Sequence, residues 1–102
     1  MKILVKDGVI IKEINWQFIY LLDTVKQTWE HHEERYPVLT SANDGKHMIS
    51  SLHYKNLAWD WRIRHLTPEE TKYWVQRLKQ VITSDFQVIL EKDHVHTEFD
   101  PN

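Results

Sequence analysis

Leu57-Ala58-Trp59-Asp60-Trp61-Arg62-Ile63 is the stretch that most clearly indicates the fold class. Its residues alternate in polarity, which predicts a β-strand with two unlike faces. One face would carry the large apolar side chains, namely Leu57, Trp59, Trp61 and Ile63. The other face would carry Ala58, Asp60 and Arg62, so that a carboxylate and a guanidinium lie side by side.

Upstream of this strand, the sequence predicts a hairpin and a helix. Lys6-Asp7-Gly8 separates two β-branched runs, which is a strong hairpin signal and predicts strands over 2–6 and 9–13. Asn15 is a suitable N-cap for a helix over 15–32. The apolar residues of that helix recur at helical spacing and predict one buried face made of Phe18, Ile19, Leu22, Val25 and Trp29. A short strand over 36–40 and a loop over 41–56 would follow.

Downstream, the sequence predicts a second helix and a closing pair of strands. Thr67, Pro68 and Glu70 form a helix start with a capping box, so we expect a helix over 68–83. Its predicted buried stripe is Tyr73, Trp74, Leu78, Val81 and Ile82. Strands over 86–90 and 94–99 follow, joined by residues 91–93. This order of elements predicts an α+β fold in which a small antiparallel sheet packs with two main helices.

Composition limits the classes of protein that fit. The chain has 102 residues, 41% of them hydrophobic and 27% charged, which is typical of a single globular domain spanning 1–102. A net charge of -2 provides no basic field for a phosphate backbone, so we expect no nucleic-acid partner. The apolar run 3–5 is too short for a signal peptide or a membrane span, which predicts a product that is cytoplasmic as synthesised. Nothing in the composition indicates an oligomeric state.

Histidines and acidic residues suggest a metal site. The chain has seven histidines and no cysteine, so a metal would be held by imidazole and carboxylate groups. His53 with Asp60, together with a third imidazole from residues 94–96, would provide three ligands and leave one position for water. Bound Zn²⁺ would acidify that water and polarise a scissile carbonyl, and a nearby carboxylate would move the proton. Asp93 with His96 and Glu91 with His94 are two registers that both satisfy this requirement.

Two spaced motifs resemble one family of enzymes. Residues 51–60, Ser-Leu-His-Tyr-Lys-Asn-Leu-Ala-Trp-Asp, resemble the Ser-x-His-x-x-Gly-x-Ala-x-Asp motif of the zinc D-Ala-D-Ala carboxypeptidases and the phage L-alanyl-D-glutamate endopeptidases. His94-Val95-His96 resembles the His-x-His motif of that family. The resemblance covers residues 38–99. It implies the fold of these peptidases, which is also described as hedgehog-like.

The resemblance also implies roles for individual residues. His53, Asp60 and His96 would bind zinc, Asp93 would be the catalytic acid/base, and His94 would support the site. This register is preferred to Glu91 with His94 because the family's ligand is the second histidine of the pair. An acidic residue commonly follows that ligand two positions later, as Glu98 does here.

The chain departs from the family pattern at two places. Asn56 replaces the motif glycine, and Asn is one of the few residues that readily adopt left-handed backbone geometry. An arginine that grips the substrate carboxylate in many relatives is absent, and Asn43-Asp44 stand near its place. Arg62 is the predicted substitute, because it shares a strand face with Asp60 and a guanidinium suits a carboxylate.

The predicted function is therefore zinc-dependent hydrolysis of peptide bonds in the stem peptides of bacterial peptidoglycan. The size of the chain resembles that of phage or prophage lysis enzymes, endolysins that reach the wall through a holin or by lysis. One alternative is a non-catalytic, metal-binding, virion-associated protein with the same fold. Another is a metal-dependent nuclease, suggested by Asp93-His94, although the charge of the chain argues against it.

Overall fold

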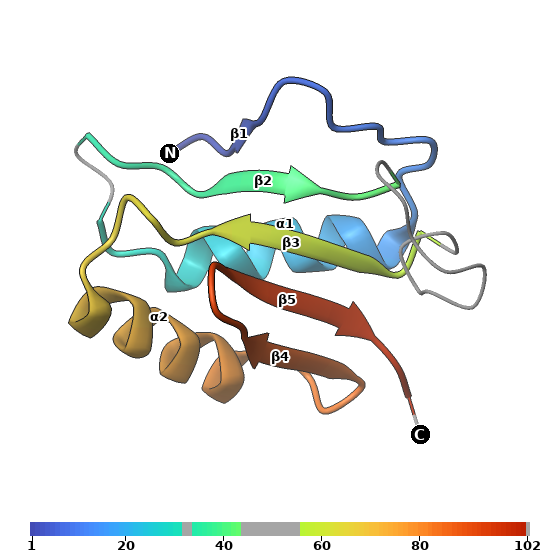
Figure 1. Ribbon diagram of the computed structural model, residues 1–102. Helices are drawn as coiled ribbons and strands as arrows, with labels where there is room; N and C mark the ends of the chain where they lie inside the picture. The colour runs from blue at the N-terminus through green and yellow to red at the C-terminus, as the bar shows by residue number, and fades with distance from the viewer. Residues whose placement is uncertain (32–33, 44–55, 102) are drawn as a thin grey trace.

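A mixed sheet and two helices build the part of the chain that the computed structural model describes, residues 1–31, 34–43 and 56–101 (Figure 1). The elements in chain order are β1 (Leu4–Val5), α1 (Trp16–Thr28), β2 (Val38–Ser41), β3 (Ala58–Arg62), α2 (Pro68–Val81), β4 (Phe86–Leu90) and β5 (His94–Phe99). The strand order is β1-β2-β3-β5-β4. Strand β1 runs parallel to β2 and the other neighbours are antiparallel, so the α+β class is confirmed but the sheet is not wholly antiparallel.

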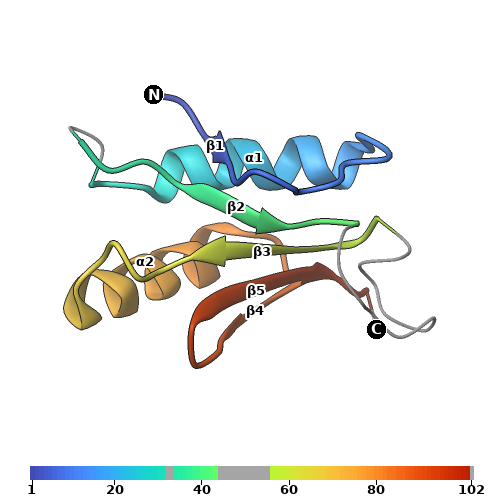
Figure 2. The ribbon, with the colours of Figure 1, turned by 45° about the horizontal axis from the view of Figure 1, so that its top comes forward.

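The two helices lie on one side of the sheet. Figure 2 shows α1 and α2 on the same side of strands β3, β5 and β4. Side chains from both helices share one buried cluster with Trp59, Trp61 and Val95 of the sheet. The opposite face carries the polar side chains of Asp60, Arg62, His94 and His96 on β3 and β5, next to Ile89 of β4. Among the described helices, none is long and apolar enough to cross a membrane.

Strand β3 has the two faces that its alternation predicts. Trp59 and Trp61 are buried, while Asp60 and Arg62 are only partly covered. Thr97 of β5 is hydrogen-bonded to both tryptophans of β3. Its hydroxyl accepts from Trp61 Nε1 at 3.0 Å and donates to the Trp59 carbonyl at 2.7 Å. Because the buried hydroxyl of Thr97 has both of its hydrogen bonds, these contacts favour a single packing of β3 against β5.

The final hairpin has the predicted bounds, 86–90 and 94–99. Phe86, Val88, Val95 and Thr97 are buried, and the residues between them face solvent or the open side of the sheet. A shift of one residue would turn each of these side chains outward, so burial sets the register of the hairpin.

Helix α1 begins as predicted, since Asn15 Oδ1 accepts from the Phe18 N–H at 2.9 Å. It ends at Thr28 rather than at 32, because Trp29 turns into extended backbone. The ring of Trp29 is buried there against Trp74, and its Nε1 donates to the Arg35 carbonyl at 2.9 Å. The buried face is rotated from the predicted one: Ile19 is 58% exposed. The buried residues of the helix are Phe18, Leu21, Thr24, Val25 and Thr28.

Helix α2 carries the predicted capping box. Thr67 Oγ1 accepts from the Glu70 N–H, and Glu70 Oε1 accepts from the Thr67 N–H at 2.8 Å. Trp74, Leu78 and Ile82 are buried as expected. The predicted burial of Tyr73 and Val81 is wrong: they are 45% and 38% exposed, and Thr71 and Val75 take their places in the stripe.

The predicted hairpin over 2–6 and 9–13 is wrong. The Leu4 and Lys6 amides donate to the Pro37 and Leu39 carbonyls, both at 2.9 Å, which places β1 parallel to β2. A turn at Asp7-Gly8 does form, with Gly8 at a φ of 89°. The chain then continues along β2, where the Ile10 carbonyl accepts from the Asn43 N–H at 2.8 Å. The turn therefore does not reverse the chain, because the residues on both sides of it hydrogen-bond to residues 37–43. Residues 9–13 form no strand.

Candidate metal centre

Pairing of β3 with β5 brings acidic and imidazole side chains together on the open face of the sheet. Asp60 lies opposite His96, and Arg62 lies opposite His94. His94 and His96 alternate with the buried Val95, so both imidazoles point away from the core. Side chains far apart in sequence therefore converge on rigid strands.

Asp60 is the centre of this cluster. Its Oδ1 lies 2.8 Å from His96 Nδ1 and 3.8 Å from His94 Nε2. One ligand atom from each of Asp60, His94 and His96 lies within 4.8 Å of the other two. We refer to these residues as the Asp-His-His cluster.

Two further carboxylates contact the imidazole nitrogens that face away from Asp60. Glu98 Oε1 lies 2.8 Å from His96 Nε2, and Asp93 Oδ1 lies 2.6 Å from His94 Nδ1. Each imidazole thus has one nitrogen toward Asp60 and the other on an outer carboxylate. Metal-binding histidines in proteins are commonly oriented in this way by a carboxylate on the second nitrogen.

Hydrogen bonding shifts two pKa values in this region. The bond to Asp60 raises the pKa of His96, which burial opposes and Glu98 reinforces. When protonated, His96 donates from Nδ1 to Asp60 and from Nε2 to Glu98, so each carboxylate accepts a hydrogen bond. The bond from His94 lowers the pKa of Asp93, so that carboxylate is ionised at neutral pH.

The cluster could hold a metal ion. One carboxylate and two imidazoles are oxygen and nitrogen donors that zinc commonly takes. With bonds of about 2.0 to 2.1 Å, neighbouring ligand atoms of a tetrahedral zinc lie about 3.3 Å apart. The separations of 2.8 and 3.8 Å from Asp60 bracket that value. A metal would replace the proton that His96 Nδ1 now shares with Asp60.

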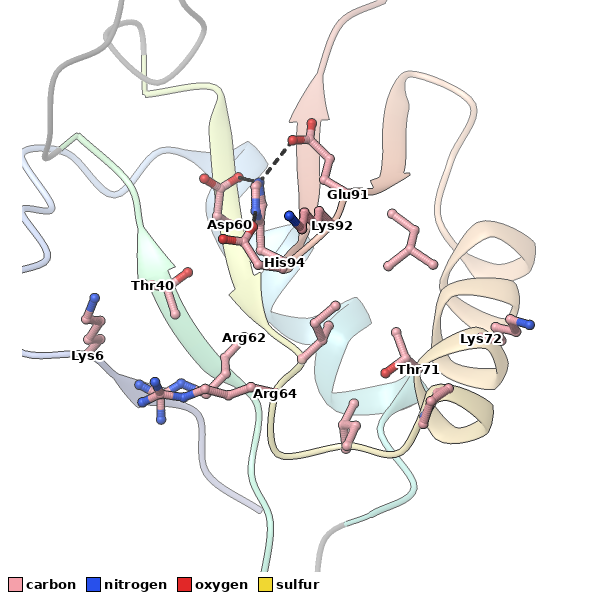
Figure 3. Close-up of a pocket in the computed structure, with 15 residues that line it drawn as sticks. Lys6, Thr40, Asp60, Arg62, Arg64, Thr71, Lys72, Glu91, Lys92 and His94 are labelled. Carbon is pink, nitrogen blue, oxygen red and sulfur yellow. Dashed lines mark hydrogen bonds and ion pairs between the residues drawn. The ribbon is translucent and has the colours of Figure 1, made fainter.

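A pocket of about 810 Å³ lies beside the cluster (Figure 3). Asp60 and His94 line it, together with Glu91 and Asp93. Glu91 Oε2 lies 3.4 Å from His94 Nε2, the nitrogen that faces Asp60, whereas Asp93 contacts the other nitrogen and is 86% exposed. The two carboxylates therefore stand on different sides of the same imidazole.

The structure unites several of the predicted site residues. Asp60 and His96 lie together as expected, and His94 belongs to the same cluster. Arg62 shares their face and lines the pocket. Asn56 has a φ of 59°, the left-handed geometry expected at the place of the motif glycine. His53 lies outside the described residues.

Sequence reasoning missed other contributors. Glu98 contacts His96, and the two-residue spacing on one strand face is the sequence signal that places their side chains together. Thr40 lines the pocket because the register between β2 and β3 shifts between Leu39 and Ser41. Lys6 lines it through the parallel pairing of β1. No local pattern signals either of these long-range effects.

No protein-family model, curated protein or solved structure matches the chain.

Proposed function

We propose that the protein is a zinc-dependent peptidase that hydrolyses peptide bonds in peptidoglycan stem peptides. The observation that carries the proposal is the Asp-His-His cluster, whose ligand atoms lie within 4.8 Å on the open face of the sheet. The resemblance of residues 51–60 and 94–96 to the zinc carboxypeptidase and endopeptidase motifs supplies the reaction and the substrate class. A role as a phage or prophage lysis enzyme rests on that resemblance alone.

Different residues of the chain would have different roles in such a reaction. Zinc, when bound, supplies Lewis-acid activation of water and of the scissile carbonyl. Asp60 and His96 would hold the ion, joined by His94 or by His53 of the motif. Glu98 would fix the tautomer and the orientation of His96, because it lies 2.8 Å from the nitrogen that faces away from Asp60.

A carboxylate must accept a proton from water and return it to the leaving amine. The geometry favours Glu91 for this step, since it lines the pocket and lies 3.4 Å from the His94 nitrogen that faces Asp60. Asp93, whose pKa is lowered by His94, would then orient that imidazole. This assignment differs from the sequence-based preference for Asp93 with His96. Variants at Glu91 and at Asp93 distinguish the two assignments.

The test combines zinc content with products of wall digestion. Purified protein would be loaded with zinc, its metal measured by mass spectrometry, and its digest of purified peptidoglycan analysed for peptide fragments. We expect Asp60→Asn and His96→Asn to lose zinc and activity together. Glu91→Gln should keep zinc and lose activity about 100-fold or more.

Matched variants make the outcome specific. Asp93→Asn should retain more activity than Glu91→Gln; the reverse result would assign the proton transfer to Asp93. Asp23→Asn on the exposed side of α1 should change neither quantity. Single variants at His53 and His94 show which imidazole completes the site. Bound zinc without peptide products would overturn the peptidase proposal in favour of a non-catalytic metal-binding protein.

A further inference from the structure

A second concave surface lies between α1 and the segment that precedes it. Residues 1–14 run beside the helix in the opposite direction (Figure 2), and side chains from both line a groove of about 520 Å³. This volume falls within the range of about 300 to 1,000 Å³ that is usual for small-molecule pockets. We refer to it as the α1 groove. It shares no residue with the pocket beside the Asp-His-His cluster.

Most of the lining of the α1 groove is apolar. Phe18 of α1 and Leu39 of β2 belong to the lining and are buried in the core. Other apolar side chains of the lining are exposed, namely Met1, Val5, Ile11, Ile14 and Ile19. Ile14 is 65% exposed. Single exposed apolar residues are ordinary, but a group of them around one concave surface commonly marks a binding site.

Helical spacing explains why α1 has this apolar face. Ile19, Leu22 and Lys26 follow one another at intervals of three and four residues, so they lie on one side of the helix. The core instead contacts the face that contains Leu21 and Val25. Residues 1–14 cover the face of Ile19 and Leu22 only in part, and the α1 groove is the space that remains.

Three charged residues line the α1 groove, namely Lys2, Asp23 and Lys26. None of the ion pairs among described residues involves them. Lys2 Nζ lies 5.0 Å from the centre of the Tyr36 ring, and Asp23 Oδ2 accepts from Gln27 Nε2 at 2.8 Å. Two cations and one carboxylate leave one net positive charge, which a single anionic group would neutralise.

The two cations belong to the same end of the groove. Because residues 1–14 and α1 run in opposite directions, the start of the chain lies toward the last turn of the helix (Figure 2). Lys2 is at that start, and Lys26 is the basic residue of that last turn. Residues 11–14 and the first turn of α1 form the other end, which has Ile11 and Ile14 in its lining.

We propose that the α1 groove binds a single-chain amphiphile with one anionic head, such as a fatty-acid carboxylate. Its acyl chain would lie along Ile19 toward residues 11–14 and displace water from the apolar side chains. Its carboxylate would lie between Lys2 and Lys26. One head matches the single net charge of the groove, and one chain suits its volume. The inference is independent of the peptidase proposal, because the groove and the metal cluster share no residue.

The test measures amphiphile binding by zinc-free protein, so that a carboxylate cannot bind through the metal. Isotope-labelled protein in chelator would be titrated with octanoate, 1-octanol and octyltrimethylammonium, which share an eight-carbon chain and carry an anionic, a neutral and a cationic head. We expect affinity to fall in that order. Amide shifts should change in residues 1–26, and butyrate, which lacks a long chain, should not bind.

Variants separate the contribution of the chain from that of the head. Ile19→Ser should raise the Kd for both octanoate and 1-octanol about fivefold or more. Lys26→Gln should raise the Kd for octanoate about threefold and leave that for 1-octanol unchanged, whereas Asp23→Asn should lower the Kd for octanoate. The controls are Lys79→Gln and Val81→Ser, which change exposed residues at the end of α2 and should alter neither Kd.

Equal affinity for the three amphiphiles, or equal effects of Lys26→Gln and Lys79→Gln, would overturn the proposal. Binding to phosphatidylglycerol vesicles without binding of octanoate would also overturn it and make this face a membrane-binding surface. Self-association that Ile19→Ser abolishes, again without binding of octanoate, would assign the groove to a second copy of the chain.

Discussion

Segments 3–11 and 86–99 each contain two apolar runs flanking a turn, but the chain continues past the turn in the first and reverses in the second. In the second segment, Val88 and Val95 are buried on the core face. In the first, Val5 is 50% exposed and Ile10 is 49% exposed. In this protein the turn reverses the chain where both flanking runs are buried, and the more exposed segment pairs with the edge of β2 instead.

The largest effect that tests this comparison is expected from shortening a valine in each segment. Val95→Ala should lower the free energy of unfolding by about 2 kcal/mol, because Val95 is fully buried. Val5→Ala should lower it by less than about 0.5 kcal/mol. Urea denaturation of both variants measures the difference. Equal losses would show that β1 contributes to the core as much as β5 does.

A smaller effect is expected at the turn of the first segment. Gly8 has a φ of 89°, and a Cβ there would meet no atom within 4 Å. The cost of Gly8→Ala is therefore backbone strain alone, about 1 kcal/mol in the free energy of unfolding. Gly8→Asn should cost less, because Asn tolerates positive φ. Wild-type stability for Gly8→Ala would mean that this turn has another conformation in solution.

The smallest effect concerns the pH dependence of β5 in zinc-free protein. The pKa of His96 is raised by Asp60 in the folded state, so folding is favoured by its protonation. This contribution is complete below the unfolded pKa of about 6.5 and is lost as the pH rises through the folded value. The stability advantage of wild type over His96→Gln should therefore shrink as the pH rises above about 6.5. An advantage that grows with pH would contradict the assigned contacts of His96.

Alternation within strands allowed much of the fold and part of the site to be predicted. The buried Trp59 and Trp61 define the face of β3, and the same period places Asp60 opposite that face. Asn15 and the Thr67–Glu70 capping box define helix starts because their hydrogen bonds are local. Alternation thus placed Asp60 on the open face, whereas its association with His96 came from the metal-site motifs, and the structure brings the two side chains together.

Features that depend on distant segments were not predictable in this way. Strand β1 pairs with β2, which lies far along the chain, so the local Asp7-Gly8 signal does not reveal its partner. Lys6 and Thr40 enter the pocket through that pairing and through the shifted register of β2. The early end of α1 accompanies burial of Trp29, whose Nε1 donates to the carbonyl of Arg35 beyond the helix.

The parallel pairing of Leu4 with Val38 has a consequence for the order of folding. On a ribosome, β1 emerges before its partner β2, which is synthesised only after α1 is complete. Closing that long loop carries an entropic cost that the short turn between β4 and β5 avoids. Strand β1 therefore waits for β2, and Lys6 reaches the pocket only when that neighbouring strand is in place.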